Sequence, residues 1–147
     1  MIEQVTEKTL PLAAYVHALS WQASHTALCS PEFIAQHTPE RQAEYLRGEM
    51  GRGKRLFLLT DGKPVGVVTV WGSLIENLYV LPEKQKMGYG TMLLDFAIRQ
   101  CENTPTLWVL NTNETARKLY LKNGFLETGT TRALNERIYE IEMVLKG

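Results

Sequence analysis

Residues 80–91 read Val80-Leu81-Pro82-Glu83-Lys84-Gln85-Lys86-Met87-Gly88-Tyr89-Gly90-Thr91, and they join a short apolar run to a long helical pattern. Gly88 and Gly90 carry no Cβ, so the backbone there can bring its N–H groups close to an anion. A helix that begins at this turn adds unpaired donors and the positive end of its dipole. The stretch therefore predicts a strand, an amide-exposing turn and a helix, with a phosphate or pyrophosphate as the ligand.

The turn matches neither of two common phosphate-binding motifs. No Lys-Ser or Lys-Thr pair follows the glycines, as a P-loop requires, and no third glycine completes the dinucleotide fingerprint. An isolated Gly-x-Gly is also typical of a structural turn that binds nothing, and that alternative stays open on these residues alone.

The residues around this turn predict an α+β fold. Upstream, three apolar runs between residues 55 and 80 are separated by Asp61-Gly62 and Gly72-Ser73, a pattern that indicates an antiparallel meander. Downstream, a helical pattern leads to the short apolar run 106–110, and a strand-helix-strand unit implies parallel pairing through a right-handed crossover. We expect a single domain over residues 1–147, with a mixed, mostly antiparallel sheet and a central parallel strand pair.

The two ends of the chain complete this fold. The first fifty residues predict a short strand and then helices, because apolar residues recur at helical spacing at Leu12, Tyr15, Val16 and Leu19. Ser30-Pro31 and Thr38-Pro39 each place a capping residue before a proline, which is a helix start signal. A helix over 114–123, capped by Asn113, and two closing strands over 125–134 and 137–145 follow.

The composition excludes several classes of function. The 147 residues suit one domain, and 16 Lys and Arg balance 16 Asp and Glu, so no net field favours nucleic acid or a membrane. Cys29 and Cys101 cannot form a disulfide framework and no Cys/His group has zinc spacing, so we expect buried thiols and no metal. The start lacks the pattern of a signal peptide, and no run is long enough to span a membrane. These features predict a soluble cytoplasmic protein.

Two segments carry a family resemblance. The first is Glu76-Asn77-Leu78-Tyr79-Val80-Leu81-Pro82 followed by Gln85-x-x-Gly88-x-Gly90, and the second is Asn113-x-x-Ala116-x-x-x-Tyr120-x-x-x-Gly124-Phe125. In this order they resemble the acyl-CoA site of the GNAT superfamily of N-acyltransferases, whose signature is Gln or Arg-x-x-Gly-x-Gly or Ala. The resemblance covers about residues 55–147. Lys86 departs from it, because many members carry glycine there.

The resemblance implies that acetyl-CoA is the cosubstrate and that it lies in a gap between two splayed parallel strands. Main-chain groups of Leu78, Tyr79 and Val80 would pair with its pantetheine arm. The pyrophosphate would be held by the turn residues, which are Gln85, Lys86, Met87, Gly88, Tyr89, Gly90 and Thr91. Asn113 would hydrogen-bond the cofactor, although an Asn at this position is equally typical of a helix N-cap.

Transfer of an acetyl group to an amine needs an acid and a base, and two residues are candidates. Tyr120 is implied as the acid that protonates the departing thiolate, with a core aromatic as its alternative. Glu76 shares strand parity with Leu74, Leu78 and Val80, so in a regular strand it faces an apolar side that suits a general base. A surface-pointing carboxylate, or one paired with a nearby Arg, is the alternative for Glu76, and Asn77 is instead a candidate for orienting the substrate only.

The remaining signals do not identify the amine. His17, His25 and His37 lack metal spacing and predict surface or capping residues, with His25 a pocket candidate, and Trp21 predicts a core or cleft-lining aromatic. The acceptor, a small molecule or a peptide, is expected near residues 21–50 and 130–137. We expect a monomer or a homodimer. A noncatalytic acyl-CoA-binding domain is the competing hypothesis, because it needs the turn but neither Glu76 nor Tyr120.

Overall fold

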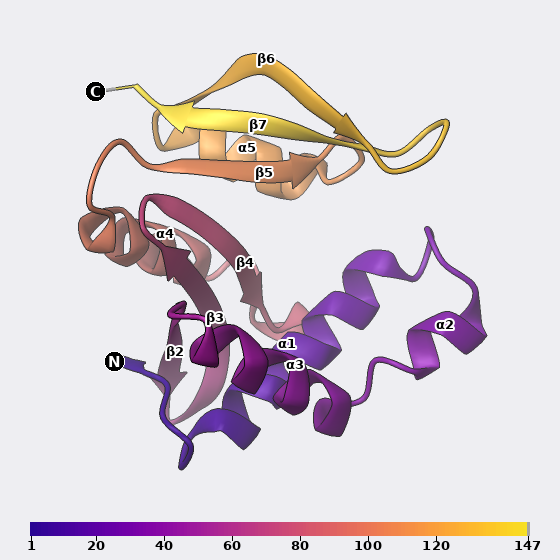
Figure 1. Ribbon diagram of the computed structural model, residues 1–147, viewed down its shortest axis with the longest axis vertical. Helices are drawn as coiled ribbons and strands as arrows, with labels where there is room; N and C mark the ends of the chain where they lie inside the picture. The colour runs from indigo at the N-terminus through magenta and orange to yellow at the C-terminus, as the bar shows by residue number, and fades with distance from the viewer. Residues whose placement is uncertain (147) are drawn as a thin grey trace.

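The fold is a single mixed sheet with helices on both faces, seen here in a computed structural model that describes residues 1–146. The strands are β1 (Ile2–Gln4), β2 (Arg55–Asp61), β3 (Lys63–Trp71), β4 (Leu74–Val80), β5 (Thr106–Leu110), β6 (Phe125–Ala133) and β7 (Tyr139–Leu145). The helices are α1 (Leu10–His25), α2 (Pro31–Ala35), α3 (Pro39–Gly51), the 3-10 turn η1 (Pro82–Lys84), α4 (Tyr89–Gln100) and α5 (Glu114–Lys122). The strand order is β1-β2-β3-β4-β5-β7-β6 (Figure 1).

The sheet has one parallel pair at its centre, β4 with β5, and its other pairs are antiparallel. The parallel register consists of Leu74 with Thr106 and Ile75 with Leu107. Beyond these pairs no pairing between β4 and β5 is found in the described chain, and the strands diverge (Figure 1). The predicted α+β class and its central parallel pair are therefore confirmed, and the divergence leaves unpaired strand edges facing each other.

Two hydrophobic clusters hold the helices against the sheet. On one face, α1 and α3 cover the N-terminal half of the sheet, with Leu10, Leu46 and Leu58 fully buried in that cluster. On the other face, α4 and α5 pack over a cluster that includes Leu93 and Phe125. Figure 1 shows α4 behind β3 and β4 and α5 behind β5 and β7, so each half of the sheet contributes one strand to the gap and one helix behind it.

The two predicted helix starts are confirmed. The Oγ of Ser30 accepts a hydrogen bond from the Phe33 N–H at 3.3 Å, and the Oγ1 of Thr38 accepts one from the Arg41 N–H at 3.2 Å. The predicted apolar stripe of α1 is partly wrong, because Leu12 and Tyr15 are each 46% exposed. The buried face of α1 combines two larger apolar residues, Leu10 and Val16, with small residues and one imidazole, at Ala13, Ala14, Ala18, Ser20 and His17.

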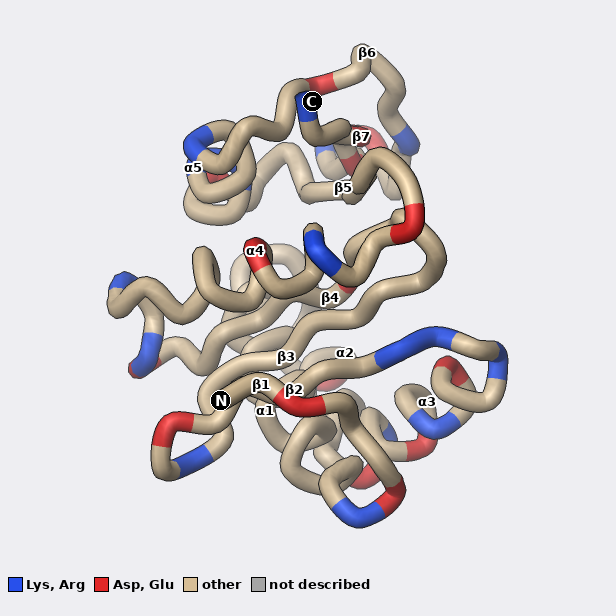
Figure 2. The backbone as a smooth tube through the Cα atoms, turned by 90° about the vertical axis from the view of Figure 1, so that its left-hand side faces the viewer, with Lys and Arg blue, Asp and Glu red and all other residues tan. Residues whose placement is uncertain are grey.

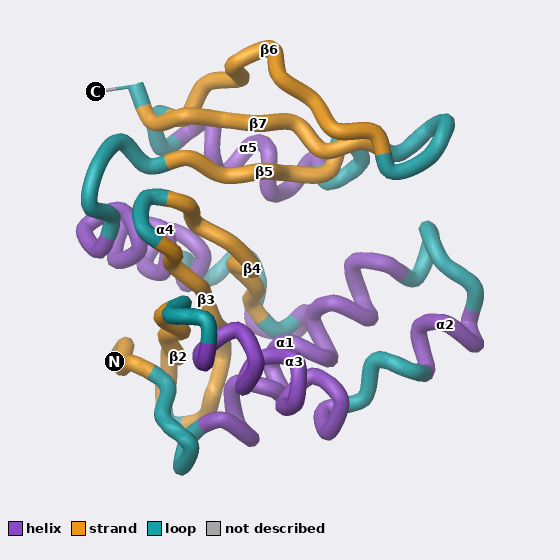
Figure 3. The backbone as a smooth tube through the Cα atoms, in the orientation of Figure 1, coloured by secondary structure: helices purple, strands orange, loops and turns teal. Residues whose placement is uncertain are grey.

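The surface carries both signs of charge. Figure 2 shows Lys and Arg interspersed with Asp and Glu along the chain, in agreement with the formal net charge of zero. Among the described residues, no helix combines the length and the hydropathy needed to cross a membrane. Both cysteines are free and half-buried rather than fully buried. The long loop between β6 and β7 projects on the same side of the molecule as α2 (Figure 3).

Candidate active site

The turn between β4 and α4 presents a row of unpaired amides. Within residues 1–146, no acceptor is found for the backbone N–H groups of residues 86–91, and the first bond of the helix runs from the Met92 N–H to the Gly88 carbonyl at 3.1 Å. Gly88 is the helix N-cap with φ +89°, a conformation that glycine adopts without strain. The positive end of the α4 dipole and these donors together suit a bound anion.

Two side chains hold this turn in place. The Gln85 Nε2 donates to the carbonyl of Val80 at 3.2 Å, which ties the loop to the end of β4. The Tyr89 hydroxyl, in the first turn of α4, donates to an Asp61 carboxylate oxygen at the β2–β3 turn, and this bond raises the pKa of Tyr89. The side chains of Gln85 and Tyr89 therefore fix the turn, and the backbone N–H groups of residues 86–91 present the donors.

Lys86 adopts the left-handed backbone conformation, with φ +65°. This conformation costs an L residue with a Cβ roughly 1–2 kcal/mol, and glycine adopts it freely. Backbone strain is therefore a physical reason for glycine at this position. Lys86 is exposed, so its ammonium group lies at the surface beside the row of unpaired amides.

Asn113 is the N-cap of α5, and its Oδ1 accepts a hydrogen bond from the Ala116 N–H at 3.1 Å. The capping role weighed in the sequence analysis is thus confirmed. A further hydrogen bond to a cofactor, through the Asn113 Nδ2, stays a prediction.

Tyr120 is the buried residue of α5, only 7% exposed, and its ring packs edge-on against Phe125 with centroids 6.0 Å apart. Burial raises the pKa of Tyr120 to about 12. Its hydroxyl also lies close enough to Tyr79 to add to the pKa rise that burial produces at Tyr79. Tyr120 is therefore a neutral phenol near neutral pH and can donate a proton or a hydrogen bond on the β4 side of α5.

A bulge in β4 corrects the predicted orientation of Glu76. The register with β3 shifts between the Val67–Tyr79 and Thr69–Glu76 pairs, and Asn77 has φ +51°. Ile75, Leu78 and Val80 consequently pack into the cluster beneath α4. Glu76 faces the other side of the sheet, because the extra residue reverses the alternation of side chains.

On that side Glu76 is paired rather than free. Its Oε1 lies 2.8 Å from the Lys54 Nζ, and the Glu49 Oε1 lies 3.2 Å from the same nitrogen. The side chains of Lys54 and Glu49 are each 8% exposed, and that of Glu76 is 30% exposed. Glu76 is therefore paired, as one alternative expected, but its partner is Lys54 and not an arginine.

The family model described as an acetyltransferase (GNAT) domain matches residues 52–127, slightly more than half of the chain. This chain belongs to the GNAT acetyltransferase family. The matched range includes both the turn and α5, so the resemblance in the two sequence motifs is confirmed. No curated protein sequence matches the chain significantly.

Several solved structures share the fold of this GNAT domain. The PaiA N-acetyltransferase of Thermoplasma acidophilum, in complex with coenzyme A, is 21% identical with a TM-score of 0.74, and the match covers 97% of this chain and 96% of that one. A GNAT-family acetyltransferase from Bacillus cereus is 18% identical, with a TM-score of 0.72 and coverage of 99% and 96%. The ribosomal-protein-S18-alanine N-acetyltransferase of Escherichia coli is 24% identical, with a TM-score of 0.65 and coverage of 99% and 92%.

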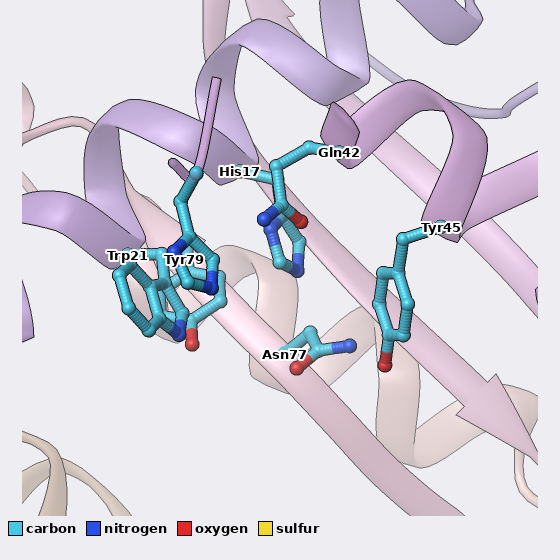
Figure 4. Close-up of a pocket in the computed structure, with 7 residues that line it drawn as sticks. His17, Trp21, Gln42, Tyr45, Asn77 and Tyr79 are labelled. Atoms are coloured by element: carbon cyan, nitrogen blue, oxygen red, sulfur yellow. The ribbon is translucent and has the colours of Figure 1, made fainter. Parts of the chain in front are cut away.

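This GNAT domain also has a pocket on the α1 and α3 side of the gap. It encloses about 190 Å³ and is lined by His17, Trp21, His37, Gln42, Tyr45, Asn77 and Tyr79 (Figure 4). None of these residues is Asp, Glu, Lys or Arg. Burial, and then the neighbouring Tyr120, Tyr45 and Glu140, raise the pKa of Tyr79.

The pocket contains residues that the sequence analysis placed at the surface. His17 is 4% exposed, and among the described residues neither of its ring nitrogens has a hydrogen-bond partner. Each unpaired buried polar atom costs about 1–3 kcal/mol. Burial, and to a lesser extent the neighbouring His37, lower the pKa of His17 to about 4, so the ring is neutral near neutral pH.

Trp21 is a fixed wall of the same pocket. The His25 ring stacks on its indole with centroids 4.1 Å apart, and the His37 ring stacks with centroids 3.6 Å apart. The prediction of a surface or capping residue is wrong for His17, and His37 is a pocket residue. His17, Trp21 and His25 are spaced four residues apart on α1, so a polar aromatic stripe along one helix face was the sequence signal for this site.

Proposed function

We propose that this chain is an N-acetyltransferase that moves the acetyl group of acetyl-CoA directly to a primary amine. The observation that carries the proposal is the row of unpaired amides at residues 86–91, beside the gap between β4 and β5. In this proposal the turn holds the pyrophosphate, and the unpaired edge at Leu78, Tyr79 and Val80 holds the pantetheine arm. The coenzyme A complex of the Thermoplasma acidophilum enzyme, which has the same fold, supports this assignment.

The chemistry requires the amine nitrogen to attack the thioester carbonyl carbon, and the resulting intermediate to expel the coenzyme A thiolate. Tyr120 is the proposed acid, because its phenol stays protonated and can give its proton to the thiolate sulfur. The burial that raises the pKa of the phenol also disfavours a thiolate at the same place, which brings the two groups closer in proton affinity.

Glu76 is the proposed base, acting through water. Its ion pair with Lys54 holds the carboxylate in a fixed place at the start of the gap, one residue before the bulge. The proton that the amine loses would pass to this carboxylate. The amine acceptor would enter from the face that carries α1 and α3, where Tyr79 connects the lined pocket to the neighbourhood of Tyr120.

Free thiol release tests the proposal. The full chain is titrated with acetyl-CoA by calorimetry and then assayed, with a colorimetric thiol reagent, against alkylamines, ring-bearing amines, amino acids, polyamines and peptides. We expect binding and amine-dependent thiol release with at least one class. Binding without release across the panel would favour the noncatalytic acyl-CoA-binding domain, and no binding at all would contradict the assignment of the turn.

A further inference from the structure

The pocket lined by His17 is built from uncharged, mostly aromatic side chains. Trp21, His37, Tyr45 and Tyr79 provide flat walls, and Gln42 and Asn77 provide amides. Figure 4 shows the His17 imidazole pointing into the space between Tyr79 and Tyr45, with Asn77 opposite. An apolar cavity of about 150 Å³ is large enough to hold one benzene molecule, so the 190 Å³ here suits a single ring.

We propose, as an extension of the proposed function, that this pocket is the acceptor subsite and that it selects amines carrying one flat, uncharged ring with a polar substituent. His17 lies at its floor and pairs with that substituent. His25 and His37 cover the two faces of the Trp21 indole, so the substrate ring packs against the indole edge and the walls of Tyr45 and Tyr79, and the amine-bearing arm extends past Tyr79 toward the gap between β4 and β5.

The protonation state of the His17 imidazole determines which substituent on the substrate ring can pair with it. A neutral imidazole offers one N–H donor and one bare nitrogen acceptor, and neither is paired within residues 1–146. A hydroxyl group on the substrate is both donor and acceptor, so it can satisfy either nitrogen. Because the imidazole is shielded from bulk water, a hydroxyl that reaches it gains a hydrogen bond for which little water competes.

The walls account for the preference for a ring over a charged chain. The stacking of His25 and His37 holds the Trp21 indole in place before any ligand arrives, so little ordering is needed on binding. His17 also packs edge-on against Tyr79, with centroids 5.0 Å apart. No carboxylate lines the pocket, so a second ammonium group, as in a polyamine, would lose water here without gaining an ion pair.

The test measures kcat/KM for 2-phenylethylamine, its three ring-hydroxylated isomers, butylamine and spermidine, with the full chain and acetyl-CoA. We expect 2-phenylethylamine to exceed butylamine and spermidine by about tenfold or more, and at least one hydroxylated isomer to exceed 2-phenylethylamine by about tenfold. In His17→Phe we expect the ratio of kcat/KM for the hydroxylated isomer to that for 2-phenylethylamine to fall to about one.

A second variant keeps the test decisive if His17→Phe misfolds. Trp21→Leu removes the indole wall, and we expect it to lower the ratio of kcat/KM for the ring amines to that for butylamine about tenfold. A preference for spermidine, or a hydroxyl advantage that survives His17→Phe, overturns the inference and leaves the acetyltransferase intact. Thiol release with none of the amines, in the wider panel as well, overturns the proposed function and this inference with it.

Discussion

Lys54 and Glu76 form an ion pair at the start of the gap, with 2.8 Å between Nζ and Oε1. Burial by itself lowers the pKa of Lys54, but hydrogen bonds to Glu76 and Glu49 outweigh it and raise that pKa. The lysine is therefore a fixed positive charge between two carboxylates, one on α3 and one on β4. Its ammonium group also lies 4.8 Å from the centroid of the Trp71 ring.

Because Lys54 has two carboxylate partners, matched variants can distinguish a catalytic role of Glu76 from a purely structural one. Glu76→Gln and Glu49→Gln each remove one partner of Lys54 and keep the side-chain shape. If Glu76 takes the proton of the amine, we expect kcat to fall by about 10² or more in Glu76→Gln and by much less in Glu49→Gln. Steady-state thiol release, with thermal unfolding as a check on folding, measures both. Equal losses in the two variants would mean that Glu76 only positions Lys54.

Tyr120→Phe tests the proposed acid. The variant keeps the ring that packs against Phe125, so we expect the fold and acetyl-CoA affinity to persist. Turnover should fall at least ~10²-fold, because the thiolate then leaves without a proton donor. Calorimetric titration and thiol release measure the two properties separately. Tyr15→Phe, which removes an exposed hydroxyl from α1, is the matched control. Turnover like that of wild type in Tyr120→Phe would reject the acid role.

The fold could be predicted from the sequence because its determinants are local. The helix caps at Ser30 and Thr38, the glycine turn at Gly88 and the parallel pair around Ile75 each follow from a few neighbouring residues. The bulge at Asn77 could not be predicted in this way. It is visible only in the register of β4 against β3, and a single extra residue decides which face Glu76 occupies.

The candidate pocket could not be predicted from the sequence, for a related reason. Each histidine by itself resembles a surface residue, and only the packing of α1 against α3 and β4 buries His17. His37 reaches Trp21 from the segment between α2 and α3, which is a tertiary contact without a motif. The glycine turn is a continuous stretch of chain and can therefore be recognised in the sequence. The candidate pocket is assembled from α1, α3, β4 and the segment before α3, so it cannot.

The variant Lys86→Gly tests two properties of the turn, the backbone strain at residue 86 and the charge of its side chain. Because Lys86 has φ +65°, glycine should raise the free energy of unfolding by about 0.5–1 kcal/mol, after the larger entropy of the unfolded chain is counted. Loss of the ammonium group should weaken acetyl-CoA binding a few-fold at low salt and reduce its salt dependence. Urea unfolding and calorimetry at two salt concentrations measure these effects. Asparagine also tolerates this backbone conformation, so Lys86→Asn should show the same loss of salt dependence. If the dependence of acetyl-CoA affinity on salt is unchanged in both variants, a contact between the Lys86 ammonium group and a phosphate is excluded.

Gly66→Ala tests how tightly α4 is seated on the sheet. A Cβ at Gly66 would lie 2.6 Å from the Leu93 Cδ1 and 3.0 Å from the Tyr79 carbonyl oxygen, so α4 or β4 must shift. We expect a loss of about 1–3 kcal/mol in stability and a weaker affinity for acetyl-CoA, since α4 carries the turn. Gly48→Ala is the matched control, because it lies in α3 with no atom within 4 Å and should stabilise the helix by up to about 1 kcal/mol. Equal stabilities of the two variants would contradict this packing.

The buried imidazole of His17 makes stability depend on pH in a predictable direction. Its pKa is lowered by burial from 6.5 to about 4, so between these values the unfolded chain binds a proton that the folded chain does not. The free energy of unfolding should therefore fall as the pH drops through this window, by about 3 kcal/mol in total from this residue.

His17→Phe removes the titration and leaves no polar atom unpaired, so the difference in stability between wild type and variant should change by that amount between pH 6.5 and pH 4. Urea unfolding at several pH values measures it, and the carboxylates that titrate in the same range cancel because both proteins contain them. Parallel stability curves for the two proteins would show that folding does not lower the pKa of the His17 imidazole, and the buried, unpaired state assigned to it would then be wrong.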